Sequence, residues 1–313
     1  MNKVSIVGTR PQFIKAAILA QTLEMDIIDT GQHYDHSLAG QYLDEFRVKA
    51  ERIESAGDVS SMYKELMWRL TPYDTVIVYG DCNTTLAGAL AADFLDKQLV
   101  HVEAGCRSFN RRMVEESIRI TVDHLADLNL CPTETALWNL KDEEMGGVFT
   151  GDLSQDYIER CAFPFVKSGS AFVTIHRAEN LENMDTILEI LEAIERPMFW
   201  PQHPKMKKYK LPPNITPIEP LPYREMIDRI YNAPFIITDS GGLQKEAYML
   251  KTKCITLRED TEWPETLHNG WNTLAMDKDT VLKALDTEPG EWIGGLFGNN
   301  AAERMKDEIE RLD

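Results

Sequence analysis

The sequence contains little cysteine, and its cysteines do not form the patterns that bind zinc or build a disulfide framework. Five cysteines are scattered over 313 residues, and no two of them form a CxxC pair. An odd number of isolated cysteines in a chain of this length argues against disulfide staples and against zinc ligands. We therefore expect reduced thiols, a cytoplasmic location and no bound metal.

Long hydrophobic runs are also missing. The most apolar stretch, residues 87–95, is interrupted by Asp93. It is much shorter than the roughly 20 apolar residues that a membrane-spanning helix needs. The first residues, MNKVSIVGTRPQF, read as a strand, a turn and the start of a helix rather than as a signal peptide. We expect no membrane partner.

Positive charge is scarce. Lys and Arg number 33 against 51 Asp and Glu, so the formal net charge is −18. A surface with this charge repels the phosphates of nucleic acids and of anionic membranes. The balance excludes general nucleic-acid binding, and an anionic small molecule would need cations placed locally at its site.

Several common catalytic motifs are absent. The chain has no HExxH, no P-loop and no Ser-His-Asp order, which argues against metalloproteases, nucleotide triphosphatases and serine hydrolases. The glycine turn after the first predicted strand is not a GxGxxG fingerprint, so no nicotinamide is indicated. We expect no cofactor.

What the chain does contain is a repeated alternation of short β-branched runs and helical segments. Runs such as residues 4–7, 75–79 and 235–238 are each followed by a turn and a helical stretch. This alternation predicts an α/β fold with doubly wound parallel sheets. The length predicts roughly two domains.

We place the domain boundary in the Pro-, Gly- and Ser-containing stretch at residues 161–169. The predicted domains are 1–166, 167–298 and a charged C-terminal helix, 299–313, which we expect to cover one of the two halves. Both larger domains are expected to be Rossmann-like. We expect a ligand cleft between them, at the ends of the parallel strands.

In the first half, charged and polar residues follow the predicted strands. Gly8, Arg10 and Lys15 follow the first strand, where a glycine turn and a helix N-terminus favour an anion. An ordinary βα turn with solvated charges explains them equally well. Gln32 and His33 follow the second strand, although a single loop histidine is more often structural than catalytic.

Carboxylates gather near the next two strand ends. Asp81 follows residues 75–79, where it would face a ligand or cap the next helix. Glu103 ends another strand, where a buried carboxylate is costly, and Arg107 adds a cation. Glu115 and Arg119 share a helical face, a spacing usually found in surface ion pairs. Carboxylates in unlike environments can divide acid and base roles.

The second half repeats this arrangement. The candidate ligand contacts after its strands are His176, Arg177, Glu179, Asn180, Ser240, Gly241, Gly242, Glu246, Arg258, Thr261 and Glu262. Small residues at 240–242 would expose backbone N–H groups to a phosphate, and Glu246 one turn later would hold ribose hydroxyls. The alternative is a glycine turn that only helps helix–sheet packing.

These motifs, in this order, resemble the non-hydrolysing UDP-N-acetylglucosamine 2-epimerases. The resemblance extends from about residue 4 to residue 275 and rests on GTRPQ with Lys15, GQH, GD, HVEAGCR, VEESIR, TIHRAEN, DSGGLQKE, REDTEWPE and GWN. The chain departs from the family pattern at Gln12 (usually Glu), Val114 (Pro) and Ile118 (Asn), and it is short for the family.

The resemblance implies a GT-B fold with UDP held mainly by the second domain. It implies that Ser240, Gly241, Gly242 and Glu246 hold the diphosphate and ribose, assisted by Arg10 and Arg258. The catalytic residues implied are Asp81, Glu103, Glu115, His176, Lys15 and Arg119. It further implies a homodimer, with a UDP-sugar as the small-molecule partner and no metal.

The implied activity is inversion at C2 of UDP-N-acetylglucosamine to give UDP-N-acetylmannosamine for polysaccharide biosynthesis. The C2 proton is not adjacent to a carbonyl, so the family eliminates UDP to 2-acetamidoglucal and adds it back. Alternatives within the fold are a hydrolysing 2-epimerase and an epimerase of a UDP-2,3-diacetamido uronic acid. Residues 108–113 of this chain resemble the loop found in that second group. A GT-B glycosyltransferase and a non-catalytic nucleotide-sugar sensor are alternatives from other classes.

Overall fold

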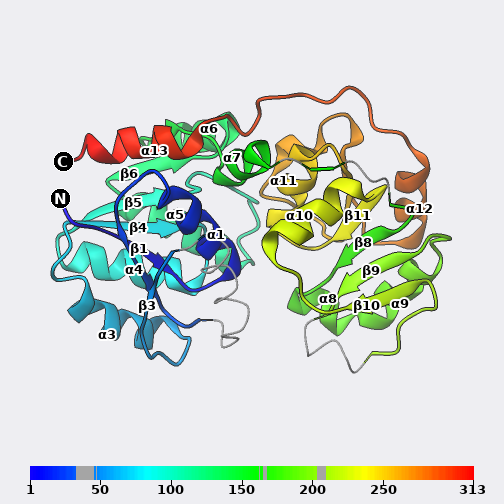
Figure 1. The fold of residues 1–313 in the computed structure, drawn as a ribbon, viewed down its shortest axis with the longest axis horizontal. Helices are drawn as coiled ribbons and strands as arrows, with labels where there is room; N and C mark the ends of the chain where they lie inside the picture. The colour runs from blue at the N-terminus through cyan, green and yellow to red at the C-terminus, as the bar shows by residue number, and fades with distance from the viewer. Residues whose placement is uncertain (33–45, 47, 162, 165–167, 203–208) are drawn as a thin grey trace. The chain divides into compact units, whose positions relative to one another are not determined.

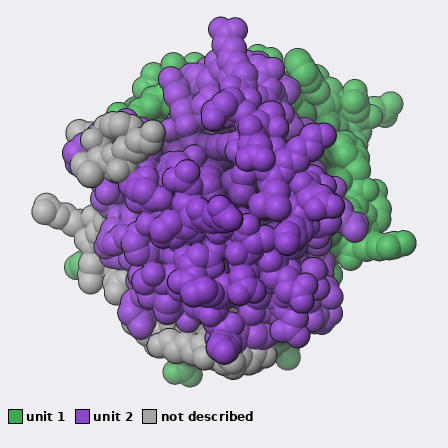
Figure 2. Space-filling model, turned by 90° about the vertical axis from the view of Figure 1, so that its right-hand side faces the viewer, with its two compact units in different colours: residues 1–160, 295–313 green, residues 161–294 purple. Residues whose placement is uncertain are grey.

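The computed structural model describes most of the chain and divides it into two compact units (Figures 1 and 2). The residues described are 1–32, 46, 48–161, 163–164, 168–202 and 209–313. Unit 1 comprises residues 1–160 and 295–313, and unit 2 comprises residues 161–294. His33, a candidate site residue, lies outside the described residues.

Unit 1 is built on a seven-stranded parallel sheet in the order β3-β2-β1-β4-β5-β6-β7. Its strands are β1 (Lys3–Val7), β2 (Asp26–Asp29), β3 (Glu51–Arg52), β4 (Thr75–Tyr79), β5 (Gln98–Val102), β6 (Leu128–Cys131) and β7 (Val148–Phe149). Its helices are α1 (Arg10–Leu19), α3 (Val59–Arg69), α4 (Asn83–Phe94), α5 (Val114–Leu125), α6 (Glu134–Asp142), α7 (Leu153–Arg160) and α13 (Ala301–Glu310).

The central strands of unit 1 are buried on both faces, which explains why β1 and β4 read as continuous β-branched runs. Helix α4 packs closely against them, and a Cβ at Gly88 would approach Val78 Cγ1 to 2.9 Å. Ile118 of α5 is buried in the same core. The departure from the family's asparagine at this position therefore places an apolar side chain in an apolar environment.

Unit 2 is built on a six-stranded parallel sheet in the order β10-β9-β8-β11-β12-β13. Its strands are β8 (Ala171–Thr174), β9 (Met198–Pro201), β10 (Ile215–Ile218), β11 (Phe235–Thr238), β12 (Lys253–Thr256) and β13 (Asn272–Leu274). Its helices are α8 (Ala178–Glu182), α9 (Met184–Glu192), α10 (Tyr223–Asn232), α11 (Gly241–Met249), the 3-10 helix η2 (Pro264–Gly270) and α12 (Lys278–Asp286). The predicted fold class, two doubly wound parallel-sheet domains, is confirmed.

Each sheet reverses its strand order once, between β1 and β4 in unit 1 and between β8 and β11 in unit 2. In doubly wound sheets, ligands bind outside the carboxyl ends of the strands at such a switch point. In unit 1 this is the location of Gly8 and Asp81, and in unit 2 it is the location of His176 and Ser240. The topology thus brings together candidate residues that are far apart in the sequence.

The C-terminal helix α13 belongs to unit 1, where it packs against α1 and α7. Asp156 of α7 accepts hydrogen bonds from the first two backbone N–H groups of the helix, Ala301 at 2.9 Å and Ala302 at 2.8 Å. Lys3 and Asp313 form an ion pair at 2.7 Å. Helix N-termini leave such N–H groups without intrahelical partners, so this buried carboxylate anchors the chain's end.

Within the part of the chain that the structure describes, no helix combines the length and the apolar character that crossing a membrane requires.

Candidate active site

Gln12 holds the turn that follows β1. Its Oε1 accepts hydrogen bonds from the backbone N–H groups of Gly8 (2.9 Å) and Thr9 (3.1 Å). Its Nε2 donates to the carbonyl of Tyr79 (2.8 Å) and to Thr85 Oγ1 (2.9 Å). An ionised glutamate has no donor for the Tyr79 carbonyl. The glutamine therefore ties the end of β1 to the end of β4, and this departure from the family pattern has a structural use.

Lys15, one turn into α1, forms an ion pair with Glu103 at the end of β5. The two side chains are only 8% and 16% exposed, so solvent screens the pair weakly. Glu103 has a φ of 72°, a left-handed conformation that costs a non-glycine residue about 1–3 kcal/mol. Its carboxylate lies beside Gly80, where a Cβ would be 3.4 Å from Oε1. Glu103 is thus held next to Gly80, the residue that precedes Asp81.

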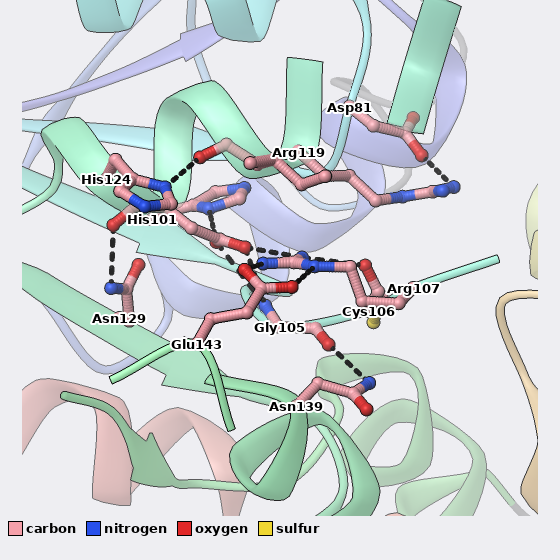
Figure 3. Close-up of polar contacts among 12 residues, drawn as sticks. Asp81, His101, Gly105, Cys106, Arg107, Arg119, His124, Asn129, Asn139 and Glu143 are labelled. Carbon is pink, nitrogen blue, oxygen red and sulfur yellow. Dashed lines mark hydrogen bonds and ion pairs between the residues drawn. The ribbon is translucent and has the colours of Figure 1, made fainter. Parts of the chain in front are cut away.

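Asp81 forms an ion pair with Arg119, a buried residue of α5. Arg119 also bonds to Glu116, whose Oε2 lies 3.0 Å from Nη1. Arg119 therefore pairs with Asp81 (Figure 3) and with Glu116, the residue next to the Glu115 that the sequence spacing had pointed to. Glu115 is half-buried in the first turn of α5.

Glu116 also shapes the loop before α5. Its carboxylate accepts hydrogen bonds from Ser108 N (2.9 Å), Ser108 Oγ (2.8 Å) and Phe109 N (2.9 Å). Phe109 has a φ of 58° and an exposed ring. Arg111 and Arg112, on the same loop, are exposed to solvent. A buried carboxylate therefore sets the shape of a loop that displays two cations.

Arg107 lies in a buried network and not at the surface of a ligand site. It forms two hydrogen bonds to Glu143, both at 2.8 Å, and an ion pair with Asp123 at 2.6 Å (Figure 3). Asp123 also contacts His101 Nδ1 at 2.7 Å. Two carboxylates thus hold the guanidinium inside unit 1, and a contact between Arg107 and substrate stays a prediction.

Asp239 stabilises the turn between β8 and α8 in unit 2 by hydrogen bonds. Its buried carboxylate accepts hydrogen bonds from the backbone N–H of His176 (3.0 Å) and Arg177 (2.9 Å) and from Asn180 Nδ2 (3.0 Å). Asn180 is itself buried and also donates to the carbonyl of Leu257. The ring of His176 remains 58% exposed, with Nδ1 at 3.2 Å from Asp239. His176 is presented to solvent, whereas Asn180 has a structural position.

The predicted phosphate site falls at the start of α11, where it stays a prediction. Ser240 is the N-cap, and its side chain accepts from Leu243 N. A Cβ at Gly241 would collide with the carboxylate of Glu262, so a larger residue there would have to displace that side chain. At Gly242 the nearest atom to such a Cβ is Ser240 Oγ at 4.0 Å, so packing does not require glycine there.

The other candidates of unit 2 lie around this helix start. Glu246 is buried and accepts a hydrogen bond from Tyr223 Oη at 2.9 Å. Arg258 is also buried, with ion pairs to Asp260 at 3.1 Å and to Glu262 at 2.8 Å. Thr261 donates to Gln244 Oε1 at 2.6 Å. Each of these side chains already has a partner that orients it.

The remaining candidates are Gln32, Arg10 and Glu179. Gln32 accepts hydrogen bonds from the N–H and the hydroxyl of Thr84, at the start of α4, so it caps that helix. Arg10 is half-buried at the first position of α1, and Glu179 is exposed on α8. Neither position conflicts with a ligand contact.

Sequence reasoning missed Asp239, Glu116, Asp123 and His101 as site residues. Asp239 directly precedes Ser240 at a strand end, a signal that was available. Glu116, Arg119 and Asp123 follow one another at helical spacing, but sequence alone does not show that this stripe is buried. His101 reads as one residue of a strand.

Comparisons with known proteins agree with this geometry. The family model described as UDP-N-acetylglucosamine 2-epimerase matches residues 16–291. A UDP-N-acetylglucosamine 2-epimerase homolog from Methanococcus maripaludis is 38% identical over 326 residues, covering 90% of this chain and 91% of that protein. A UDP-2,3-diacetamido-2,3-dideoxy-D-glucuronate 2-epimerase from Pseudomonas aeruginosa is 33% identical, with 100% of both chains covered.

A solved structure is similar over the full length. The UDP-GlcNAc 2-epimerase of Methanocaldococcus jannaschii, in complex with UDP-GlcNAc and UDP, has a TM-score of 0.86 at 31% identity and covers 100% of both chains. The glycotransferase of kitacinnamycin, at 12% identity and a TM-score of 0.57, shares the fold alone. The chain has a GT-B fold and belongs to the UDP-N-acetylglucosamine 2-epimerase family.

The buried network makes unit 1 sensitive to acid. Burial alone would raise the pKa of Asp123, but hydrogen bonds and charges from His101 and Arg107 outweigh it and hold that pKa below its ordinary value of 3.8. Because the folded-state pKa is the lower one, the ionised carboxylate stabilises the fold above about pH 4. This contribution is lost as the pH falls through the folded-state pKa.

We expect Asp123→Asn to destabilise unit 1 by about 3–5 kcal/mol at neutral pH, because it breaks a buried pair. The difference from wild type should shrink as the pH falls below about 4. Urea unfolding followed by circular dichroism from neutral to acid pH measures it. Asp142→Asn, at an exposed position of α6, is the control. A difference that is constant with pH would contradict the assignment.

Proposed function

We propose that this protein is a non-hydrolysing epimerase that inverts C2 of UDP-N-acetylglucosamine to give UDP-N-acetylmannosamine. The observation that carries the proposal is that two carboxylates follow the adjacent strands β4 and β5, each with its own cation: Asp81 with Arg119, and Glu103 with Lys15. The two differ in exposure and in partner, as a pair that divides acid and base roles requires. We further propose a cytoplasmic homodimer that supplies polysaccharide biosynthesis.

The proposed chemistry proceeds by elimination and re-addition. The C1–oxygen bond to UDP breaks with its electron pair on the phosphate, and a carboxylate removes the C2 proton to give 2-acetamidoglucal. UDP then re-forms the C1–oxygen bond while an acid delivers a proton to the opposite face of C2. Atoms and charge balance without a cofactor. Acid–base groups of this kind each contribute about 10²–10⁴-fold in rate.

We propose that unit 2 supplies the nucleotide-binding residues. The start of α11 offers backbone N–H groups and the positive end of a helix dipole to the diphosphate. The residues proposed to contact UDP are Ser240, Gly241, Gly242, Glu246 and Arg258, with Arg10 of unit 1. We propose that His176, Arg177, Glu179, Thr261 and Glu262 contribute to the site, and that Glu115 acts with the catalytic carboxylates.

Glu103→Gln should lower turnover by about 10²–10⁴-fold, because it removes a carboxylate that exchanges a proton with the sugar. UDP binding, measured by calorimetry, should be retained. Wild-type turnover in D₂O should place deuterium at C2 of the product, detected by NMR.

The matched control is Glu144→Gln. Glu144 is also a glutamate with a left-handed backbone (φ 59°), but it is exposed near the end of α6. Its replacement should not change turnover. Product formed without deuterium would contradict the mechanism, and near-normal turnover of Glu103→Gln would remove Glu103 from the catalytic set.

Gly242→Ala tests the phosphate site. A methyl group fits in the free protein at this position, so the melting temperature should not fall. If a phosphate approaches the backbone there, the overlap should cost about 1–3 kcal/mol and weaken UDP binding by about tenfold or more. Gly169→Ala, where nothing lies within 4 Å, is the control in the same unit. Unchanged UDP affinity of Gly242→Ala would contradict the proposed site.

A second candidate substrate is a UDP-2,3-diacetamido uronic acid. The Pseudomonas relative that spans the full chain carries that name, and Arg111 and Arg112 offer cations suited to a sugar carboxylate. Parallel assays with both UDP-sugars, followed by NMR of the products and of free UDP, discriminate the substrates and detect hydrolysis. If the uronate is the substrate, Arg111→Gln and Arg112→Gln should reduce kcat/KM for it and not for UDP-N-acetylglucosamine.

A further inference from the structure

His101 is completely buried, and both of its ring nitrogens face hydrogen-bond acceptors. Nε2 lies 2.8 Å from the carbonyl oxygen of Gly80, and Nδ1 lies 2.7 Å from Asp123 Oδ1. A carbonyl oxygen has no proton to donate, so Nε2 must carry the proton of that bond. The state of the ring then depends on which partner holds the proton between Nδ1 and Asp123.

The surroundings of Asp123 favour its ionised form. It accepts hydrogen bonds from Gly105 N at 3.2–3.3 Å and forms an ion pair with Arg107 at 2.6 Å. A protonated carboxyl group would place a neutral acid against a guanidinium. The proton therefore belongs on Nδ1, which makes the ring an imidazolium.

The charges in the network around this ring cancel. Arg107 contributes a second positive charge, and Glu143 a second negative charge, with a pKa that the hydrogen bonds from Arg107 hold below its ordinary range. On β6, burial raises the pKa of the Cys131 thiol to about 12, so this group stays uncharged. Two cations and two carboxylates thus offset one another, as a buried charge requires.

This network ties together the backbone around the proposed catalytic pair. Gly80, which accepts from His101, directly precedes Asp81 and has a φ of 62°. Gly105, which donates to Asp123, follows the strained Glu103 by two residues. Asp123 lies one turn after Arg119 on α5. The segments that carry both carboxylates are therefore anchored to one histidine–aspartate pair.

We propose that His101 is a buried imidazolium that, through Asp123, acts as a positioning residue for Asp81 and Glu103. It does not contact the substrate. Its catalytic consequence rests on the proposed function, whereas its protonation state does not. A neutral side chain at this position cannot donate to both Gly80 and Asp123 from opposite ends, so one of the two segments would lose its anchor.

The protonation state is tested by ¹⁵N NMR of histidine-labelled wild-type protein. Both ring nitrogens of His101 should carry protons and show imidazolium shifts in the folded protein. The signal is assigned by its loss in His101→Gln, or by its displacement in Asp123→Asn. A deprotonated ring nitrogen in the folded protein would overturn the proposal.

The positioning role is tested by separating kcat from UDP binding. His101→Gln should lower kcat on the order of 100-fold, because small displacements of reacting groups have effects of this size. Its affinity for UDP should stay at the wild-type value. His101→Lys, which keeps a positive charge and several donors, should recover part of the lost kcat. His124→Gln, an exposed residue of the same helix as Asp123, should leave kcat unchanged.

Unchanged kcat in His101→Gln, or a loss of UDP affinity that parallels the loss of kcat, would overturn the positioning role. If neither His101 variant folds, the NMR measurement on the wild type, assigned with Asp123→Asn, still decides the protonation state on which the positioning role depends. A wild-type protein that turns over neither UDP-sugar would instead contradict the proposed function, with the NMR result again independent of it.

Discussion

The buried charged face of α5 is the feature on which the site of unit 1 depends. Glu116, Arg119 and Asp123 lie on this face and bond respectively to the 108–109 loop, to Asp81, and to His101 with Arg107. Each of these charges would be costly in the core without its partner. Removing one would therefore disturb the backbone at several strand ends together, which makes the helix a frame for the candidate carboxylates.

In unit 2 a single buried carboxylate has the same role as the charged face of α5. Asp239, at the switch point of its sheet, accepts backbone and side-chain hydrogen bonds from the turn after β8 while preceding the cap of α11. A buried carboxylate thus joins two strand ends in each unit. The accepting carboxylates, Asp123 and Asp239, were not among the residues predicted from sequence. The residues that they orient were predicted, because they follow strands.

Buried cations accompany the candidate carboxylates even though the chain carries a net charge of −18. Lys15, Arg119 and Arg258 are buried or nearly so, and each is paired with carboxylates at a strand end or helix start. Screening by water and salt is weak at such positions, so each of these ion pairs is stronger than a pair at the exposed surface. The strained backbone of Glu103 is held in place by the Lys15 ion pair and by the hydrogen bond from its N–H to the carbonyl of Leu130.

The sequence by itself determined the α/β fold, the family and the strand ends where polar residues gather. Those signals are local: β-branched runs, glycine turns and helix starts lie within a few residues of one another. Only the tertiary structure decided which charges are buried and with what partners. Arg107 bonds to Glu143, Asn180 bonds to Asp239, and Asp156 bonds to the first turn of α13 in unit 1. These pairings join residues 36, 59 and 145 positions apart, where packing and not local pattern selects the partner.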